Sequence, residues 1–420
     1  MRKWLSLAAT ITFLAAFCVS TLPAAEVEEG FVSLFNGQDL TGWVKHGGSG
    51  TYHVEDETIV GETVPDTPHN TFLCTDKEYG DFILKLEFMM EIPMDSGIQF
   101  RSHVTPAGDI MHLYGYQSQI DAHLNQDMGR LYDEGRRGFQ HGIIWMTDET
   151  PEQKEKLYPL AMNEWHTMEI QCVGPSIRTW VNGVAMTNTF DDFDLSGIIG
   201  LQVHCGGPGK IRWRNIRIKD LGKTEWKSFF ITGEDGKMKL ADARFVLPDD
   251  WAFDDEKGML VGNHQPSEGR DGLVVSDANY TDLVTRVTYL IFGGNSGLYF
   301  RAEEIDVPHL LRGFQNEIAG NARDSALWDT GGRGWVAFND DLVGKAMKPN
   351  DWNTIMTAAY GDRIIDKING FTTFDILDPE CHKTGKVGLQ LHGGTEMKIW
   401  FKDFQVIEFT EEMKALIDRE

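Results

Sequence analysis

The sequence predicts an all-β protein that consists of two similar β-sandwich domains in tandem. Many short segments alternate apolar and polar residues and are separated by glycine and asparagine turns, a pattern typical of β-sandwiches and jelly rolls. The motif DSGIQFRS at 95–102 also returns as NSGLYFRA at 295–302, which lies 200 residues later. A repeat at this distance, in a chain of 420 residues, indicates a duplicated domain.

The first domain is predicted to span 26–221. A strand ending in a turn is expected at 31–37, and Phe82, Leu84, Leu86 and Phe88 alternate as the core face of another strand. The Asn182-Gly183 pair is a candidate type I′ hairpin turn. Further strands are expected at 52–61, 95–102, 116–121, after 163–165, at 197–207 and at 211–218.

The second domain is predicted at 229–409, after a short linker at 222–228. Its expected strands follow the order of the first domain, and Asn369-Gly370 repeats the hairpin turn. Because the linker lacks a long proline- or serine-rich stretch, the two domains are expected to touch. Helix signals are few, at 151–157 and in the tail at 410–420. The matching strands are expected at 251–262, 283–289, 295–302, 314–319, after 350–352, at 385–394 and at 397–407, and the segment 325–331 repeats 129–135.

The net charge limits the partners that the protein can have, and the N-terminal residues indicate where it is located. The chain has 39 basic and 64 acidic residues, a net charge of −25, which disfavours a nucleic-acid partner. Residues 1–25 are typical of an export signal, which predicts a periplasmic, cell-surface or extracellular protein. An uncleaved membrane anchor is the alternative, whereas Phe17 before Cys18 disfavours a lipoprotein. No later segment is long and apolar enough to span a bilayer.

The four cysteines beyond the signal do not define a disulfide framework or a zinc cluster. They are Cys74, Cys172, Cys205 and Cys381, without a C-x-x-C pair. The sequence leaves two alternatives open: one disulfide bridge among the first three cysteines, or free thiols that are buried.

Polar side chains recur at matching places on one face of three predicted strands. Amides, carboxylates, arginine and histidine on a curved sheet suit the hydroxyl groups of sugars, whereas a solvated outer face has no need to repeat residue types. We therefore predict a ligand site on this face. Its candidates are Gln99, Arg101, Gln117, Gln119, Asp121, Gln202 and His204, with the second-copy equivalents Tyr299, Arg301, Gln315, Glu317, Gln390 and His392.

A loop at 129–137, dense in charge, could close over this face. Asp133, Glu134 or Arg136 would then contact the ligand, and local ion pairs at the surface are the alternative. The scattered histidines lack the spacing of a zinc site. The tryptophans at 43, 165, 213, 352 and 400 are expected to pack in or at the edge of the core rather than to bind sugars.

Several motifs together resemble the 3-keto-disaccharide hydrolase domain family. They are FNGQDLTGW at 35–43, SGIQFR at 96–101, YQSQID at 116–121, NEW at 163–165, WVNG at 180–183, GLQVH at 200–204 and RNIRI at 214–218. The resemblance covers nearly all of 31–221, and a weaker second copy without the FNG opening runs over 229–409. It implies two tandem concanavalin A-like jelly rolls, exported from glycan-degrading bacteria, that cleave glycosides oxidised at the sugar 3-position.

The implied reaction gives roles to the candidate residues. The 3-keto group acidifies the hydrogen on carbon 2, so a general base can remove it before the group on carbon 1 leaves. His204 or Asp121 would be the base and Arg101 the oxyanion partner, with the amides orienting hydroxyls. A divalent metal could replace or assist Arg101. Glutamine replaces the family's frequent glutamate at 117 and 315, and Glu317 and Ala319 stand where the first copy has Gln119 and Asp121.

Two alternatives remain open at the level of the sequence. Glycoside hydrolysis by two carboxylates is a weaker fit, because no predicted strand carries Glu-x-Asp-x-Glu. A non-catalytic carbohydrate-binding or adhesion module is the alternative from another class, since duplicated sandwiches gain avidity.

Overall fold

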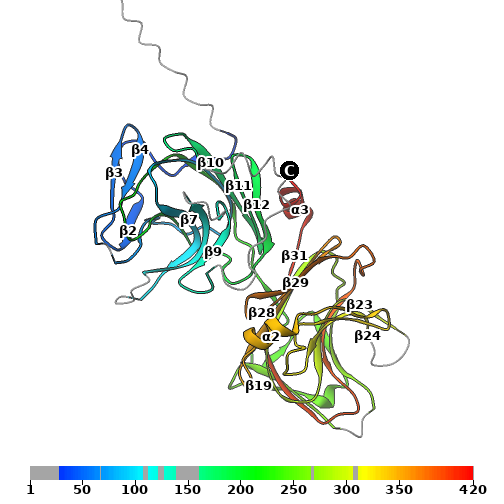
Figure 1. Cartoon of the computed structure of the whole chain (residues 1–420). Helices are drawn as coiled ribbons and strands as arrows, with labels where there is room; N and C mark the ends of the chain where they lie inside the picture. The colour runs from blue at the N-terminus through cyan, green and yellow to red at the C-terminus, as the bar shows by residue number, and fades with distance from the viewer. Residues whose placement is uncertain are drawn as a thin grey trace, which may run out of the picture.

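The computed structural model describes residues 28–66, 68–106, 112–121, 127–138, 160–265, 269–305 and 311–419. Two β-sandwiches follow one another along the chain (Figure 1). Strands dominate both, so the prediction of an all-β protein with two tandem jelly rolls is confirmed. The predicted export signal at 1–25 and the predicted helix at 151–157 lie outside the described residues.

The first sandwich consists of a front sheet and a back sheet. The front sheet has the order β2-β5-β13-β7-β8-β9, and the back sheet the order β12-β11-β10-β6-β14-β4-β3, with β1 paired to β14. The front strands are β2 (Trp43–Gly47), β5 (Thr71–Thr75), β13 (Ile198–Val203), β7 (Asp95–Val104), β8 (Leu113–Asp121) and β9 (Leu131–Glu134). The back strands are β12 (Val184–Phe190), β11 (Ser176–Val181), β10 (His166–Val173), β6 (Asp81–Ile92), β14 (Lys210–Gly222), β4 (Thr58–Glu62), β3 (Thr51–Glu55) and β1 (Val32–Ser33).

The second sandwich repeats this strand order. Its front sheet runs β18-β21-β30-β23-β24-β25-β26 and its back sheet β19-β20-β31-β22-β27-β28-β29, with β15 paired to β31. The front strands are β18 (Ala243–Val246), β21 (Gly272–Ser276), β30 (Lys386–Leu391), β23 (Ser296–Glu304), β24 (Leu311–Ile318), β25 (Leu327–Thr330) and β26 (Gly334–Ala337). The back strands are β19 (Trp251–Asp254), β20 (Met259–His264), β31 (Met397–Glu408), β22 (Leu283–Gly293), β27 (Asn353–Tyr360), β28 (Arg363–Ile368), β29 (Phe371–Leu377) and β15 (Lys227–Ser228).

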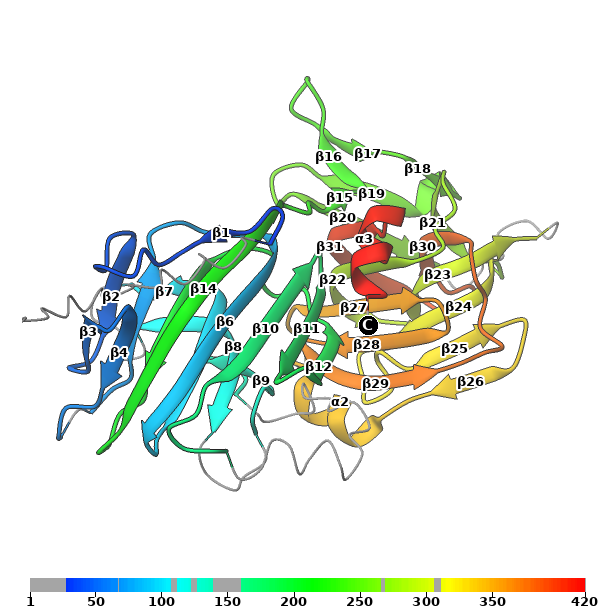
Figure 2. The same cartoon turned by 90° about the horizontal axis from the view of Figure 1, so that it is seen from above.

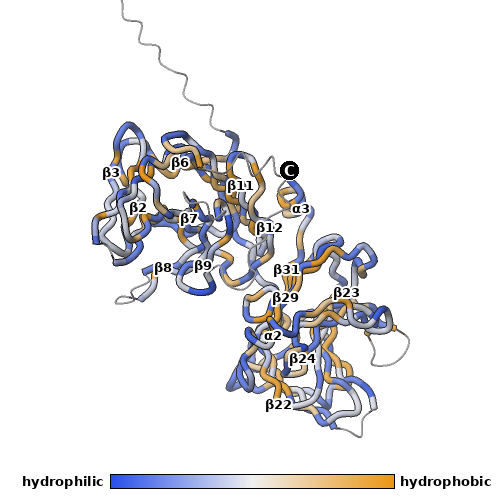
Figure 3. The backbone as a smooth tube through the Cα atoms, in the orientation of Figure 1, coloured by the Kyte–Doolittle hydropathy of each residue, from blue (hydrophilic) through white to orange (hydrophobic). Residues whose placement is uncertain are grey.

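Each sandwich encloses its own apolar core between the two sheets. The alternation along β6 buries Phe82, Leu84, Leu86 and Phe88 against Trp213 of β14, as the period of two predicts. Figure 3 shows apolar residues along strands such as β6 and β22 and hydrophilic residues in many of the connections. On the first front sheet, Gln99, Gln117 and Gln119 alternate with the core residues Ile98, Phe100, Tyr116 and Ile120 and therefore face away from the core.

The two Asn-Gly hairpins have the predicted conformation. Asn182 and Gly183 have φ angles of +50° and +76°, and Asn369 and Gly370 have +50° and +83°. Positive φ at both central residues is the mark of a type I′ turn, which matches the twist of the flanking strands. The pairs connect β11 to β12 and β28 to β29, at equivalent places in the two back sheets.

The sandwiches touch through a buried ionic contact, as the short linker predicts. Asp191, from the first sandwich, is fully buried and lies 2.7 Å from Nζ of Lys367 on β28. Arg137 also donates to Asp191 and to the carbonyl oxygen of Gly370. Burial opposes ionisation of Asp191, but Arg137 and Lys367 outweigh it and hold the pKa well below its usual range.

A C-terminal helix reinforces this contact. Helix α3 (Glu411–Ile417) follows the last strand of the second sandwich and contacts both sandwiches: it lies beside β11 and β12 of the first in Figure 1 and over the second in Figure 2. Its carbonyl groups at Leu416 and Ile417 accept hydrogen bonds from Gln171 and Arg178. An apolar cluster completes the interface with Val173, Phe190, Val284, Met356, Ala358, Ile365, Phe409 and Ile417.

Several local expectations need correction. The strand expected at 31–37 is reduced to β1, because Ser33 and Phe35 form a side-chain turn. Helix α2 (Asp340–Ala346) was not predicted, although Asn339 caps it through Leu342 N and two aspartates follow in its first turn. The remaining small elements are the hairpin β16 (Phe230–Thr232) and β17 (Met238–Leu240) and the 3₁₀ turn η1 (Pro248–Asp250).

The four cysteines of the described residues are free thiols, which decides the open choice between a bridge and free thiols for them. Cys74, Cys172 and Cys381 are buried, and Cys205 is half-buried. Within the described part of the chain, no helix has the length and apolar character that a membrane span requires.

Candidate functional site

A chain of amide hydrogen bonds crosses the front sheet of the first sandwich. Ser102 Oγ donates to Gln99 Oε1 at 2.7 Å, and Gln99 Nε2 donates to Gln117 Oε1 at 2.7 Å. Gln117 Nε2 then donates to Gln119 Oε1 at 2.6 Å. Each amide is therefore fixed in orientation, and the Nε2 donor of Gln119 ends the chain without a partner among the described residues. We call these four residues the amide chain.

The repeated glycine of the SGI motif makes room for this chain. A side chain at Gly97 would place its Cβ 2.3 Å from Cδ of Gln117, which is closer than any real contact. Gly297 stands in the same relation to Gln315, at 2.4 Å from Cγ. The glycine in both copies thus lets a glutamine lie flat across the neighbouring strand.

Glu134 is the buried carboxylate of this face. It ends β9 and is 4% exposed. Its side chain contacts two amides of the same face, one from the residue before β5 and one from β13. Asn70 Nδ2 lies 3.4 Å from Oε1, and Gln202 Nε2 lies 3.4 Å from Oε2. Burial raises the pKa of Glu134 to about 7, with a smaller opposing effect from Asn70. A carboxylate with this pKa can accept and return a proton near neutral pH.

Two other predicted members, Gln202 and His204, lie towards Glu134, whereas Asp121 lies at the opposite end of β8 from the residue that pairs with Glu134. Gln202 is buried on β13, and its Oε1 accepts no hydrogen bond from the described residues. His204 lies just beyond the end of β13 rather than on it, half-buried, with Nδ1 2.8 Å from the carbonyl oxygen of Cys205. Asn70 Oδ1 accepts from Cys205 N at 2.9 Å and so ties this turn to Glu134. Asp121 ends β8, buried, opposite Asp95 in the ladder.

Arg101 does not belong to this face, so its predicted catalytic role is wrong. A bulge in β7 and a φ of +46° at Arg101 break the alternation that would have placed it beside Gln99. Its side chain is 0% exposed. The guanidinium donates to Asp81 Oδ1 at 2.8 Å and to the carbonyl oxygens of Gly80 and Gly174 at 2.8 and 2.7 Å. Arg101 therefore has a structural role: it links β7 to the start of β6 and to the residue that follows β10.

Arg301 shows that this arrangement is a property of the fold. It has a φ of +47° and donates to Asp282 Oδ1 at 3.1 Å and to the carbonyl oxygens of Thr281 and Gly361. The repeated arginine is thus explained by structure in both copies, and its predicted role at the second site is also wrong.

The charged segment at 129–137 divides into a site residue and a structural network. Glu134 contacts the amides, but Asp133, its neighbour on β9, points the other way and is fully buried. Arg136 Nε lies 2.8 Å from Asp133 Oδ1, and Arg137 also binds Asp133. Arg136 in addition binds Asp194 at 2.5 Å. Asp133 and Arg136 are instead engaged in local ion pairs, the alternative that the sequence left open for this segment.

The front face of the second sandwich forms a cavity of about 350 Å³. Gln315 Nε2 lies 3.3 Å from Glu317 Oε2, and Asn295 also donates to Glu317. Burial raises the pKa of Glu317. The predicted members Glu317, Gln390 and His392 therefore do lie together. The cavity is lined by Asp271, Asn295, Tyr299, Gln315, Glu317, Trp328, Thr330, Trp335, Gln390 and His392.

The carboxylates of the two faces differ in position. Thr330 ends β25 where Glu134 ends β9, and it donates to Gln315 Oε1 at 3.4 Å. Gln390 Nε2 instead contacts Asp271 Oδ2 at 2.7 Å, from the segment that precedes β21. Two tryptophans, Trp328 and Trp335, add apolar surface, with ring centroids 4.8 Å apart. The second face thus has a cavity lined by polar and aromatic side chains but lacks the carboxylate that corresponds to Glu134.

Glu134 was predicted as one of three possible ligand-contacting residues of a charged loop, without distinction from Asp133 and Arg136. The signal that could have placed it is the repeat itself, since 129–135 aligns with 325–331 and both segments continue the polar strands. Neither copy shows an evident metal centre in the described ranges, where no three His, Cys, Asp or Glu side chains gather closely enough to hold an ion.

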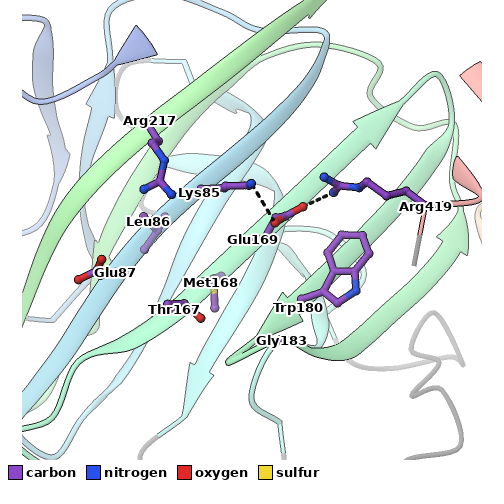
Figure 4. Close-up of a pocket in the computed structure, with 10 residues that line it drawn as sticks. All are labelled: Lys85, Leu86, Glu87, Thr167, Met168, Glu169, Trp180, Gly183, Arg217 and Arg419. Carbon is purple, nitrogen blue, oxygen red and sulfur yellow. Dashed lines mark hydrogen bonds and ion pairs between the residues drawn. The ribbon is translucent and has the colours of Figure 1, made fainter. Parts of the chain in front are cut away.

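A second cavity, of about 360 Å³, lies on the back sheet of the first sandwich (Figure 4). Lys85 and Arg419 approach Glu169 there, and Arg419 lies 5.5 Å from the Trp180 ring centroid. Lys85 and Arg419 thus form ion pairs with Glu169. Arg419 belongs to the segment that follows α3. We interpret this cavity as part of the seat of the C-terminal segment rather than as a ligand site.

The comparisons with known proteins agree with the duplicated architecture. A model of the 3-keto-alpha-glucoside-1,2-lyase-like domain matches the chain twice, at residues 30–219 and 225–407. A comparison with curated proteins gave no match.

Solved structures resemble single sandwiches of this chain. A candidate glycosyl hydrolase from Parabacteroides distasonis ATCC 8503 is 19% identical, with a TM-score of 0.34, and the match covers 46% of this chain and 95% of that one. The carbohydrate-binding module CBM66 from Bacillus subtilis is 15% identical, with a TM-score of 0.31, over 42% of this chain and 94% of that one.

Proposed function

The chain belongs to the 3-keto-alpha-glucoside-1,2-lyase-like domain family, and we propose that its first sandwich cleaves 3-keto-glycosides. The observation that carries this proposal is Glu134, a buried carboxylate whose pKa is raised to about 7 by burial and whose oxygens face two amides. Such a group is suited to remove a weakly acidic proton from carbon. His204 and Asp121 remain candidates for the second proton transfer.

The proposed reaction is an elimination. Glu134 takes the proton from carbon 2, and the electron pair of the C–H bond moves towards the 3-keto oxygen to form an enediolate. The enediolate then expels the group on carbon 1, which leaves as an alkoxide and takes up a proton. The 3-keto group re-forms as a double bond appears between carbons 1 and 2, so the step yields an alcohol and a 1,2-unsaturated 3-keto sugar, which addition of water converts into the free 3-keto sugar. The cost is concentrated in the negative charge on the 3-oxygen, so donors aimed at that oxygen matter most.

The amide chain supplies oriented donors and acceptors for this sugar. Its terminal donor, Gln119 Nε2, and the unpartnered acceptor, Gln202 Oε1, are both available to hydroxyl or keto oxygens of a ligand. Because Gln99 and Gln117 hold one another, Gln119 cannot turn its amide without breaking the chain. Fixed direction is what a site needs if it is to stabilise a developing charge without reorganising.

The test is turnover of paired substrates. The purified protein is incubated with 3-keto-glucosides and with their unoxidised parents, and the released aglycone is measured with and without EDTA. Release from the keto substrates alone supports elimination, and a loss of release with EDTA would add a metal to the mechanism. No release from either set, with binding to glycans intact, would overturn the proposed activity.

A second candidate function is carbohydrate binding without catalysis, and the second sandwich favours it. Its cavity keeps the amides and gains Trp328 and Trp335, but Thr330 and Ala319 replace Glu134 and Asp121. Tryptophan side chains offer apolar surface to the C–H faces of sugars. Retardation of the protein in gels that contain a glycan, lost in Trp328→Ala but kept in Glu134→Gln, would assign binding to this cavity.

We further propose that the protein is exported, on the basis of the residues at 1–25. N-terminal sequencing of the protein secreted or transported by a bacterial host would test this. A mature N-terminus that begins near Glu26 is the expected result, and an intact Met1 in the cytoplasm would overturn it.

A further inference from the structure

The outer face of the second back sheet carries lysines that lie over aromatic rings. Along β31, Lys398, Trp400 and Lys402 point outwards, whereas the residues between them are buried. Lys402 Nζ lies 4.3 Å from the ring centroid of Trp352. Lys398 Nζ lies 5.4 Å from that of Phe292 and 5.9 Å from that of Trp400.

The three rings form a continuous strip. The ring centroids of Phe292 and Trp400 are 4.6 Å apart, and those of Trp400 and Trp352 are 6.5 Å apart. Phe292 is 52% exposed, and both tryptophans are half-buried. We call Phe292, Trp400 and Trp352 the aromatic strip. Trp352 and Trp400, expected to pack in or at the edge of the core, thus lie half-buried on the outer face.

On the equivalent face of the first sandwich, the basic residues form ion pairs with carboxylates of the neighbouring strand. Arg214 lies over Trp165, with Cζ 3.8 Å from the ring centroid, as Lys402 lies over Trp352. Arg214 Nε, however, also lies 2.6 Å from Glu87 Oε2, on the adjacent strand β6. Arg212, two residues earlier, likewise binds Glu91.

The second sandwich has lost both of these carboxylates. The ladder places Thr288 opposite Lys402, where the first sandwich has Glu87 opposite Arg214. Four residues along β22, Phe292 stands where β6 has Glu91. Lys398 and Lys402 accordingly form no ion pair with any carboxylate of the described ranges, although the protein has a net charge of −25.

The aromatic strip leads into a groove between the sandwiches. This cavity, of about 460 Å³, is lined by Trp352, by Lys348 and by Phe193 of the first sandwich. Lys348 is exposed and, among the described residues, also lacks an ion pair. Asp192 and Asp403 line the groove as well, but Asp192 is held by Arg286 at 3.2 Å.

We propose that the aromatic strip and its lysines bind an anionic glycan chain, one that carries carboxylate or sulfate groups. The rings offer flat apolar surface to the C–H faces of the sugars, and each lysine can move from its ring to an anionic substituent. Charge complementarity selects an anionic occupant, because Lys348, Lys398 and Lys402, which form no ion pair with a described carboxylate, lie along this surface on a protein with a net charge of −25. This surface is on the back sheet, so the proposal does not rest on the activity proposed for the front face.

The test is affinity electrophoresis of the full chain in gels that contain dextran sulfate, polygalacturonate, neutral dextran or polyphosphate. The first two separate sulfate from carboxylate recognition, and polyphosphate is a polyanion without sugar rings. Retardation by one or both anionic glycans is expected, and it should exceed retardation by dextran and polyphosphate. Trp400→Ala and Lys402→Gln should each weaken binding roughly tenfold, the loss typical of one good contact with a charged group.

A restored variant gives the sharpest comparison. Thr288→Glu with Phe292→Glu re-creates the carboxylates of the first sandwich, keeps both lysines, and should reduce binding more than either single variant. Lys239→Gln, at an exposed lysine on β17, should bind like the wild type. Equal binding by wild type and the restored variant, equal retention by polyphosphate and glycan, or no retention by any glycan would each overturn the proposal.

Discussion

Gln202 Nε2 lies 3.4 Å from Glu134 Oε2, whereas the equivalent Gln390 Nε2 lies 2.7 Å from Asp271 Oδ2. The same glutamine thus meets a carboxylate in both copies, but the carboxylate comes from a different part of the sheet. A carboxylate that has moved cannot reach the same atom of a bound sugar. The duplicated faces are therefore expected to differ in chemistry rather than to act as two equal sites.

Replacing Glu134 by glutamine should remove turnover of 3-keto-glycosides, with a fall in kcat of about 10²- to 10⁴-fold, because the amide cannot accept the proton. The matched variant Glu317→Gln should keep most of the activity, since Glu317 lies on the second front face. Steady-state kinetics on one keto substrate measures both. If Glu317→Gln lost activity and Glu134→Gln kept it, the active site would lie in the second sandwich and not in the first.

The raised pKa of Glu134 predicts a pH-dependent cost to stability. The ordinary pKa is 4.5 and the value in the fold is about 7, so between these values the folded chain binds more protons than the unfolded chain. Stability contributed by this site therefore falls as the pH rises from about 4.5 to about 7, by up to roughly 3 kcal/mol.

Glu134→Gln isolates this effect, because glutamine has no proton to lose. Urea unfolding of wild type and variant should give similar free energies of unfolding near pH 4.5, and a more stable variant at pH 8. A difference that does not change with pH would mean that the carboxyl group titrates in its ordinary range.

Arg101 is expected to matter for stability and not for substrate binding. Arg101→Met leaves Asp81 buried without its ion-pair partner, which should lower the free energy of unfolding by about 3–5 kcal/mol. Asp81→Asn is the matched variant at the other end of the pair. At a temperature where Arg101→Met remains folded, its KM should equal that of the wild type, and a large rise in KM alone would return Arg101 to the site.

Lys367→Met should weaken the contact between the sandwiches. The ammonium is buried 2.7 Å from Asp191, so its loss should cost about 3 kcal/mol even though Arg137 remains. Calorimetry should then show two transitions in place of one, as each sandwich unfolds separately. Lys348→Met, at an exposed lysine, is the control, and a single unchanged transition in Lys367→Met would show that this ion pair does not couple the sandwiches.

Alternation and turn chemistry were enough to predict the two sandwiches, because each is a local property of the chain. Phe82 and its alternating partners are in the core, and both Asn-Gly pairs form the predicted turns. The same reasoning placed Gln99, Gln117 and Gln119 on one face. It failed at Arg101, where a bulge interrupts the period of two, and a bulge depends on contacts with Asp81 and Gly174 that are distant in the sequence.

The role of Glu134 could not be predicted from its neighbours for a similar reason. Asp133 and Glu134 are adjacent acidic residues in one charged segment, and only the pairing of β9 with β8 decides which of them faces the amides. The contacts with Asn70 and Gln202 that bury Glu134 span more than 60 residues of sequence. Charge alone favours neither residue.

Helix α3 sets the order in which the molecule can be completed during synthesis. The first sandwich leaves the ribosome before the second, but the carbonyl groups that bind Gln171 and Arg178 belong to a helix made after both. Until then, Val173 and Phe190 have no apolar cover from Phe409 and Ile417. In a nascent chain, the folded first sandwich therefore exposes these apolar residues to solvent. They are fully covered only after helix α3 has been translated.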